Sequence, residues 1–120
     1  MSAKKAKKKS KKELKHLADL YAYKVFYSED DKCFVATCAE FASLSGLGED
    51  RYKALEEVEN VVIESLEDMN KCGEELPSPL STGKYSGKIS LRLSPEKHRE
   101  LALESQFENI SMNQLIANKL

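Results

Sequence analysis

The side chains best suited to chemistry in this chain lie in one short segment of alternating character, residues 88–94. The polar positions hold groups that can donate hydrogen bonds: Lys88, Ser90 and Arg92. The positions between them hold apolar side chains: Ile89, Leu91 and Leu93. This period of two predicts a β-strand with one exposed and one buried face. Arginine and lysine can donate to guanine, and serine can bond to most base edges, so the exposed face is suited to reading the major groove.

Two helices must follow this strand and hold it in place. Ser94 is a favoured N-cap and Pro95 a favoured first helical residue, so together they predict a helix start. A second helix is predicted to begin at Ser111, with Gln114 at the spacing of a capping box. Residues 87–120 are therefore predicted to form a strand–helix–helix unit.

Such a small unit cannot bury the apolar faces of its strand and both helices by itself. The simplest partner is a second copy, with the two strands paired antiparallel, so we expect a homodimer. The first backbone N–H groups of the second helix would then bind DNA phosphates beside the ribbon. They belong to Ser111, Met112 and Asn113. A lone alternating strand is more often an ordinary edge strand, but the two helices behind it favour the base-reading interpretation.

Formal charge is strongly segregated along the chain, although its net value is only −1. Residues 1–15 hold eight lysines and one glutamate, a balance of +7, and residues 16–83 have a balance of −10. Residues 84–120 have a balance of +2. Residues 1–20 are predicted to be a basic tail and a short helix, with a capping box at Ser10. The lysine run could bind nucleic acid or an acidic partner, or could be a solvated tail.

Residues 21–76 predict a small antiparallel sheet with one main helix. Runs of β-forming residues indicate a hairpin of Tyr21–Tyr27 and Cys33–Ala39, joined by a polar loop of about five residues. A third, shorter strand is expected at Ser43–Ser45, and the glycines that follow it would let the chain turn.

The strongest helix signal follows Asp50, a favoured N-cap. Apolar side chains recur there at helical spacing: Leu55, Val58, Val62, Leu66 and Met69. Gly73 supplies a left-handed residue past the helix end, and the proline-rich residues 77–86 predict a linker. The chain is thus expected to be an α+β protein, with one domain over residues 21–76 and a second over residues 87–120.

No side chains are spaced for catalysis or metal binding, and we expect neither an enzyme nor a bound cofactor. The tightest acidic cluster is consecutive in a turn, where its carboxylates would not converge on a metal: Glu29, Asp30 and Asp31. The cysteines lack zinc-site spacing and are expected to be reduced thiols of a cytoplasmic protein: Cys33, Cys38 and Cys72. The sequence has no apolar run long enough to span a membrane and no signal-peptide pattern.

The C-terminal residues resemble ribbon-helix-helix modules of the MetJ/Arc type. The matching pieces are the alternating strand, Ser94-Pro95-Glu96, Leu101-Ala102, and the segment from Asn109 to Ile116 that opens the second helix with Ser-x-Asn. Asn109 stands where a glycine is usual, and asparagine is the next best residue for the left-handed conformation. By position, the resemblance assigns base reading to the polar side chains of the strand.

The front part of the chain resembles the HicB antitoxin domain. The matching segments are Tyr23-Lys24-Val25, Phe34-Val35-Ala36, Glu40 to Gly48, Ala54-Leu55, and Gly73 with Leu76-Pro77 and Pro79. The resemblance implies a reduced RNase H-like fold without activity over residues 21–76. It also implies a type II antitoxin that neutralises a small, basic, mRNA-cleaving HicA-like toxin and represses its own operon by binding operator DNA.

Two other functions are compatible with the same residues. The chain could be a free-standing ribbon-helix-helix repressor whose front domain binds a ligand or oligomerises. It could also be an interaction module that uses residues 87–120 only for dimerisation. A neighbouring reading frame for a small basic protein would favour the antitoxin, and a mobility shift with the upstream DNA would separate DNA binding from dimerisation alone.

Overall fold

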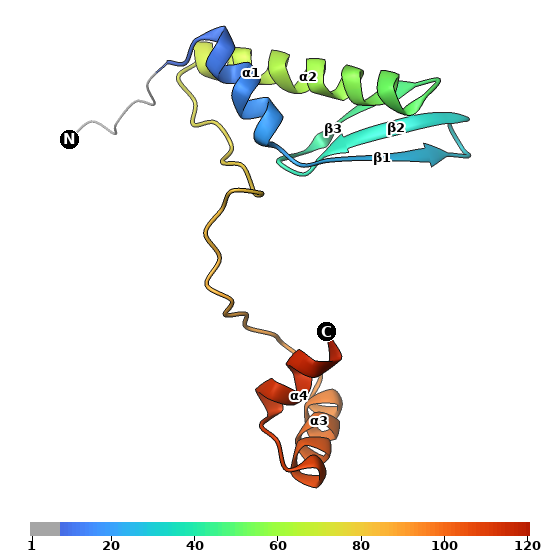
Figure 1. The fold of residues 1–120 in the computed structure, drawn as a ribbon, viewed down its shortest axis with the longest axis vertical. Coiled ribbons are helices and arrows are strands. Elements are labelled where there is room, and N and C mark those ends of the chain that lie inside the picture. Colours follow the sequence, from blue (N-terminus) through green and yellow to red (C-terminus); the bar gives the residue numbers. More distant parts are fainter. Residues whose placement is uncertain (1–7) are drawn as a thin grey trace, which may run out of the picture. The chain divides into compact units, whose positions relative to one another are not determined.

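The computed structural model describes residues 8–120. The chain divides into two compact units, a front unit Met1–Lys84 and a C-terminal unit Tyr85–Leu120 (Figure 1). The front unit contains α1 (Lys11–Leu20), β1 (Tyr23–Ser28), β2 (Cys33–Cys38), β3 (Phe41–Gly48) and α2 (Arg51–Lys71). The C-terminal unit contains α3 (Pro95–Glu108) and α4 (Met112–Lys119). The α+β class and the antiparallel sheet agree with the prediction.

Helix α1 begins with the capping box predicted at Ser10. The Ser10 Oγ atom accepts a hydrogen bond from the Glu13 backbone N–H at 3.2 Å, and the Glu13 carboxylate accepts one from the Ser10 N–H at 3.4 Å. One face of the helix buries Leu14 and Ala18 in the core. Tyr21, predicted as the first residue of a strand, instead ends the helix with an extended backbone and a buried side chain.

The sheet has the strand order β1–β2–β3, and both neighbouring pairs are antiparallel. Strands β1 and β2 form the predicted hairpin in a register that pairs Tyr23 with Cys38, and residues 29–32 make its turn. Strand β3 is longer than the short segment predicted, because its hydrogen bonds with β2 extend over eight residues with one register shift beside Cys38.

Gly46 and Gly48 lie inside β3 and do not form the turn predicted for them. Strand β3 packs so closely on α2 that a Cβ atom at Gly46 would lie 2.4 Å from the backbone N of Val58 and 2.6 Å from the carbonyl O of Ala54. At Gly48 it would lie 2.4 Å from the backbone N of Ala54. The two glycines therefore set the distance between the sheet and the helix.

Helix α2 covers one face of the sheet, as Figure 1 shows, and supplies much of the front core. Asp50 caps it as predicted and accepts a hydrogen bond from the Lys53 N–H at 2.9 Å. A stripe of fully buried side chains faces the sheet: Ala54, Val58, Val62 and Leu66. Leu55 and Met69, predicted on the same stripe, are only half-buried. The helix ends before Gly73, whose φ of +71° is the left-handed conformation predicted there.

The first part of the predicted linker 77–86 is fastened to the front unit. The Tyr21 hydroxyl donates a hydrogen bond to the carbonyl O of Pro77 at 2.7 Å. The Ser81 hydroxyl donates one to the carbonyl O of Leu20, also at 2.7 Å. The attachment continues to Gly83, whose backbone N–H donates a hydrogen bond to the carbonyl O of Leu80 at 3.3 Å.

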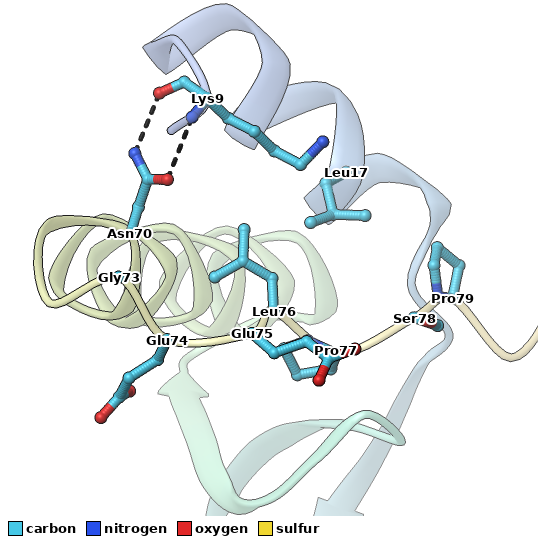
Figure 2. A pocket seen from close by; sticks show the side chains of 10 residues that line it. All are labelled: Lys9, Leu17, Asn70, Gly73, Glu74, Glu75, Leu76, Pro77, Ser78 and Pro79. Carbon is cyan, nitrogen blue, oxygen red and sulfur yellow. Dashed lines mark hydrogen bonds between the residues drawn. The ribbon is translucent and has the colours of Figure 1, made fainter. Parts of the chain in front are cut away.

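Glu40, between β2 and β3, completes this attachment. Its carboxylate accepts hydrogen bonds from the backbone N–H groups of Ala22 at 3.0 Å and Leu80 at 2.8 Å. Partial burial alone would raise the pKa of Glu40, but these donors outweigh it and lower the pKa below its ordinary value. One carboxylate thus ties the start of β1 to the chain that leaves α2. A hollow of about 350 Å³ lies beside this departing chain, with Leu17 and Leu76 in its lining (Figure 2).

Candidate nucleic-acid interface

The two helices of the C-terminal unit begin where the sequence predicts. Ser94 caps α3 by accepting a hydrogen bond from the Lys97 N–H at 3.2 Å, and Pro95 is its first residue. Asn109 ends α3 with a φ of +56°, so the asparagine adopts the left-handed conformation that a glycine more often supplies. Helix α4 then starts one residue after Ser111.

Ser111 makes only half of the capping box predicted for α4. Its Oγ atom accepts a hydrogen bond from the Gln114 N–H at 3.0 Å. The Gln114 side chain does not return to the cap, because its amide donates to the Asn118 side chain at 2.7 Å, one helical turn further on. The cap is still sufficient to start the helix.

Few side chains hold α3 and α4 together. The buried residues of the C-terminal unit are Leu101, Ser105 and Leu115. The Ser105 hydroxyl is satisfied by the carbonyl O of Ala102 at 2.9 Å. On the outside, Lys119 Nζ lies 3.1 Å from Glu104 Oε1, an exposed ion pair worth on the order of 0–1 kcal/mol. This core is too small to account for the apolar residues that the unit contains.

The strand predicted at residues 88–94 is absent from the single chain. Its apolar side chains are exposed, Ile89 at 78%, Leu91 at 59% and Leu93 at 43%. A strand requires hydrogen bonds to a neighbouring strand, and within residues 8–120 no other segment pairs with this one. The predicted ribbon needs its second strand from another copy, so the structure of one chain leaves that pairing a prediction.

The predicted base-reading side chains are all accessible. Lys88, Ser90 and Arg92 are exposed, and within the described part of the chain their side chains make no hydrogen bond or ion pair. At the start of α4, Ser111 and Asn113 are exposed and Met112 is half-buried. The N–H groups of Met112 and Asn113 have no acceptor inside the helix, as at any helix start. Both predicted groups are thus available to a ligand.

The structure also exposes an apolar surface on α3 that the sequence analysis did not predict. Leu103 and Phe107 are one helical turn apart, and Phe107 is 89% exposed. The signal was present as an i, i+4 pair of large apolar residues that does not coincide with the buried Leu101 and Ser105. The C-terminal unit therefore exposes apolar side chains both on residues 89–93 and on α3.

Other kinds of site receive no support from the described residues. Among residues 8–120, no group of three or more histidine, cysteine or acidic side chains is placed to hold a metal ion. In the same part of the chain, no helix is long and apolar enough to cross a membrane. The cysteines are free thiols, with Cys38 buried and Cys72 exposed.

Comparison with known proteins connects this chain to one family. The model of the HicB family matches residues 69–120, which contain the end of α2, the segment that leaves it, and the whole C-terminal unit. No curated protein and no solved structure matches the chain. The match covers fewer than half of the residues and shows that this part of the chain is similar to the HicB family.

Proposed function

We propose that the chain is a dimeric, cytoplasmic antitoxin that neutralises a small basic HicA-like toxin and represses its own operon. One observation carries the DNA-binding half of this proposal. Residues 88–94 alternate accessible donor side chains with exposed apolar ones, directly before a pair of capped helices that lack a sufficient core.

Pairing two copies would resolve this exposure. If two such segments align antiparallel, Ile89, Leu91 and Leu93 of both copies lie on one face and can pack against the α3 helices, including Phe107. The opposite face then presents Lys88, Ser90 and Arg92 of each copy. A two-stranded ribbon fits the major groove, and Arg92 can donate two hydrogen bonds to one guanine. The start of α4 would bind a phosphate and fix the register.

The acidic face of the front unit supports the toxin-binding half. Exposed carboxylates run along α2: Glu56, Glu57, Glu64 and Asp68. Burial and then repulsion from Asp19 and Glu56 raise the pKa of Glu59, which is half-buried beside them. A basic partner placed over this face would relieve the repulsion. A toxin that binds RNA must carry positive charge, so the two surfaces are complementary.

The DNA-binding half is tested by replacing the predicted reading arginine. Arg92→Ala should weaken operator binding by about 1–3 kcal/mol and relax the preference at one base position. Arg99→Ala, an exposed arginine on α3, is the matched control with the same loss of charge. Mobility shifts with operator and random duplexes measure both. If Arg92→Ala binds both duplexes as the wild type does, the segment is not the reader.

The toxin-binding half is tested by reversing charge on α2. Glu56→Lys with Glu64→Lys should slow association with the product of a neighbouring small basic reading frame by at least tenfold at low salt, and less at high salt. Glu29→Lys with Asp30→Lys, in the hairpin turn, changes the net charge equally and is the control. Association rates that are equal for both pairs across a salt series would remove α2 from the toxin interface.

A further inference from the structure

The front unit has a positively charged surface around the start of α1, separate from the polar side chains of residues 88–92. The lysines of this surface that the structure describes are all exposed: Lys8, Lys9, Lys11, Lys12 and Lys15. Within residues 8–120, none of them forms a salt bridge. Glu13 is the one acidic residue among them, and its carboxylate already accepts hydrogen bonds from Ser10. Lys15 lies close enough to Glu59 of α2 to counteract the rise in the pKa of that carboxyl group, so the charges most available to an external anion are those of Lys8, Lys9, Lys11 and Lys12.

This basic surface is held on the front unit by a specific contact. The Asn70 side chain accepts a hydrogen bond from the Lys9 backbone N–H at 3.0 Å and donates one to the Lys9 carbonyl O at 2.9 Å (Figure 2). The pair joins the residue before the α1 cap to the last turn of α2. These lysines consequently have a defined position on the fold and are not merely a solvated run of charge.

The position of the lysines is unfavourable for the helix itself. A helix N-terminus carries partial positive charge, so cations there are repelled and anions attracted. Lys11 and Lys12 nevertheless occupy the first turn of α1. Glu13 in the same turn compensates part of this repulsion, but the lysines of the surface outnumber it, an excess that is typical of a functional surface.

We propose that this surface, Lys8 to Lys15, binds the phosphodiester backbone of nucleic acid without reading its sequence. The inference rests on the proposed function, in which the C-terminal unit reads DNA. Residues 16–83 carry a balance of −10 and would be repelled by a duplex near that unit, and the +7 of residues 1–15 offsets this repulsion. Lys11 and Lys15 are one turn apart, about 6 Å along the axis, close to two base steps of about 3.4 Å each.

The experiment neutralises the surface and measures the salt dependence of binding. Lys8, Lys11, Lys12 and Lys15 are changed together to Gln in the full chain. The matched control changes four exposed lysines elsewhere on the front unit: Lys24, Lys32, Lys53 and Lys84. Binding to operator DNA, random duplex DNA, random RNA and poly-glutamate is followed across a salt series, with far-UV circular dichroism to verify folding.

The surface variant should bind operator DNA and random duplex DNA more weakly than the wild type, and by the same factor. The slope of log K, where K is the DNA-binding constant, against the logarithm of salt concentration should be shallower by roughly 0.9 for each phosphate that the variant no longer neutralises. The control variant should change the affinity for operator DNA and for random duplex DNA by less than about twofold. Arg92→Ala changes operator preference and leaves random binding, so a failure of the reading unit is distinguishable from a failure of this surface.

Three other outcomes decide the inference. A decrease in affinity confined to random RNA keeps the phosphodiester interaction and assigns it to RNA. A decrease confined to poly-glutamate overturns the inference in favour of an acidic protein partner. The inference is overturned altogether if the surface variant has wild-type affinity and salt slope with every probe. It is also overturned if the control variant shows equal decreases in affinity.

Discussion

The front unit and the C-terminal unit of this chain differ in how completely each is folded by its own residues. The front core joins α1, α2 and β2 through buried side chains on every element, including Leu14, Ala36 and Val62. The C-terminal unit buries only Leu101, Ser105 and Leu115 within the described residues and exposes larger apolar side chains such as Phe107. The front unit thus forms a core from its own residues, whereas the C-terminal unit leaves apolar side chains exposed that the proposed dimer would bury.

The same sequence pattern has different outcomes in the two units. Strand β1 alternates Lys24 with the half-buried Tyr23 and Val25, and β2 lies beside it after a turn of residues 29–32. Residues 88–94 alternate just as regularly and form no strand, because the described chain has no neighbour for them. The alternation of polar and apolar residues determines which face of a strand is apolar, but the strand forms only where a neighbouring strand can pair with it.

The largest expected effect comes from breaking the proposed dimer interface of the C-terminal unit. Leu91→Asp would place an unpaired charge in the buried face of the ribbon, at a cost of about 3–5 kcal/mol for each copy. We expect the variant to sediment as a monomer with an intact front unit and to lose operator binding. Tyr52→Asp, at an 83% exposed position on α2, is the control and should remain a dimer. A dimeric Leu91→Asp variant would contradict the predicted pairing.

An intermediate effect is expected from the contact between β3 and α2. Gly46→Ala adds a methyl group where the backbone of Val58 and Ala54 already lies within 2.6 Å, so the helix must move away from the sheet. Overpacking of this kind should lower the free energy of unfolding of the front unit by about 1–3 kcal/mol or more. Urea denaturation measures the change, and Ser45→Ala on the same strand should change stability by less than about 0.5 kcal/mol. Dimerisation should survive in both variants, and equal stability of the two would refute the close packing.

The smallest effect concerns the attachment of the chain that leaves α2. The folded pKa of Glu40 lies below its ordinary 4.5, so its stabilisation is complete above that value and is lost as the pH falls through the folded pKa. In the Glu40→Gln variant, the free energy of unfolding of the front unit should therefore fall less steeply than in the wild type as the pH is lowered. Thermal unfolding at a series of pH values measures this, with Glu29→Gln in the hairpin turn as the control. Parallel curves for Glu40→Gln and the wild type would show that this carboxylate does not hold the segment.

Local signals in the sequence were sufficient to predict the helix starts and the hairpin. Ser10, Asp50, Ser94 and Ser111 each cap a helix because a side-chain oxygen near the first turn is a property of a few adjacent residues. The left-handed residues Gly73 and Asn109 followed from the same local chemistry.

Features that depend on distant residues were not predictable in this way. The roles of Gly46 and Gly48 depend on how closely a helix approaches, and the role of Glu40 on a segment that lies forty residues away in the chain. Lys88, Ser90 and Arg92 are exposed, but the strand that would align them requires a second copy, so their reading role stays a prediction.

Residues 88–94 should become a strand only when two copies of the chain meet. Amide hydrogen exchange of the wild-type chain over a range of concentrations tests this dependence directly. We expect the amides of residues 88–94 to exchange quickly in dilute solution and slowly once the dimer forms, while those of α2 remain protected throughout. Fast exchange of residues 88–94 at every concentration, including in the presence of operator DNA, would contradict a ribbon formed by two copies.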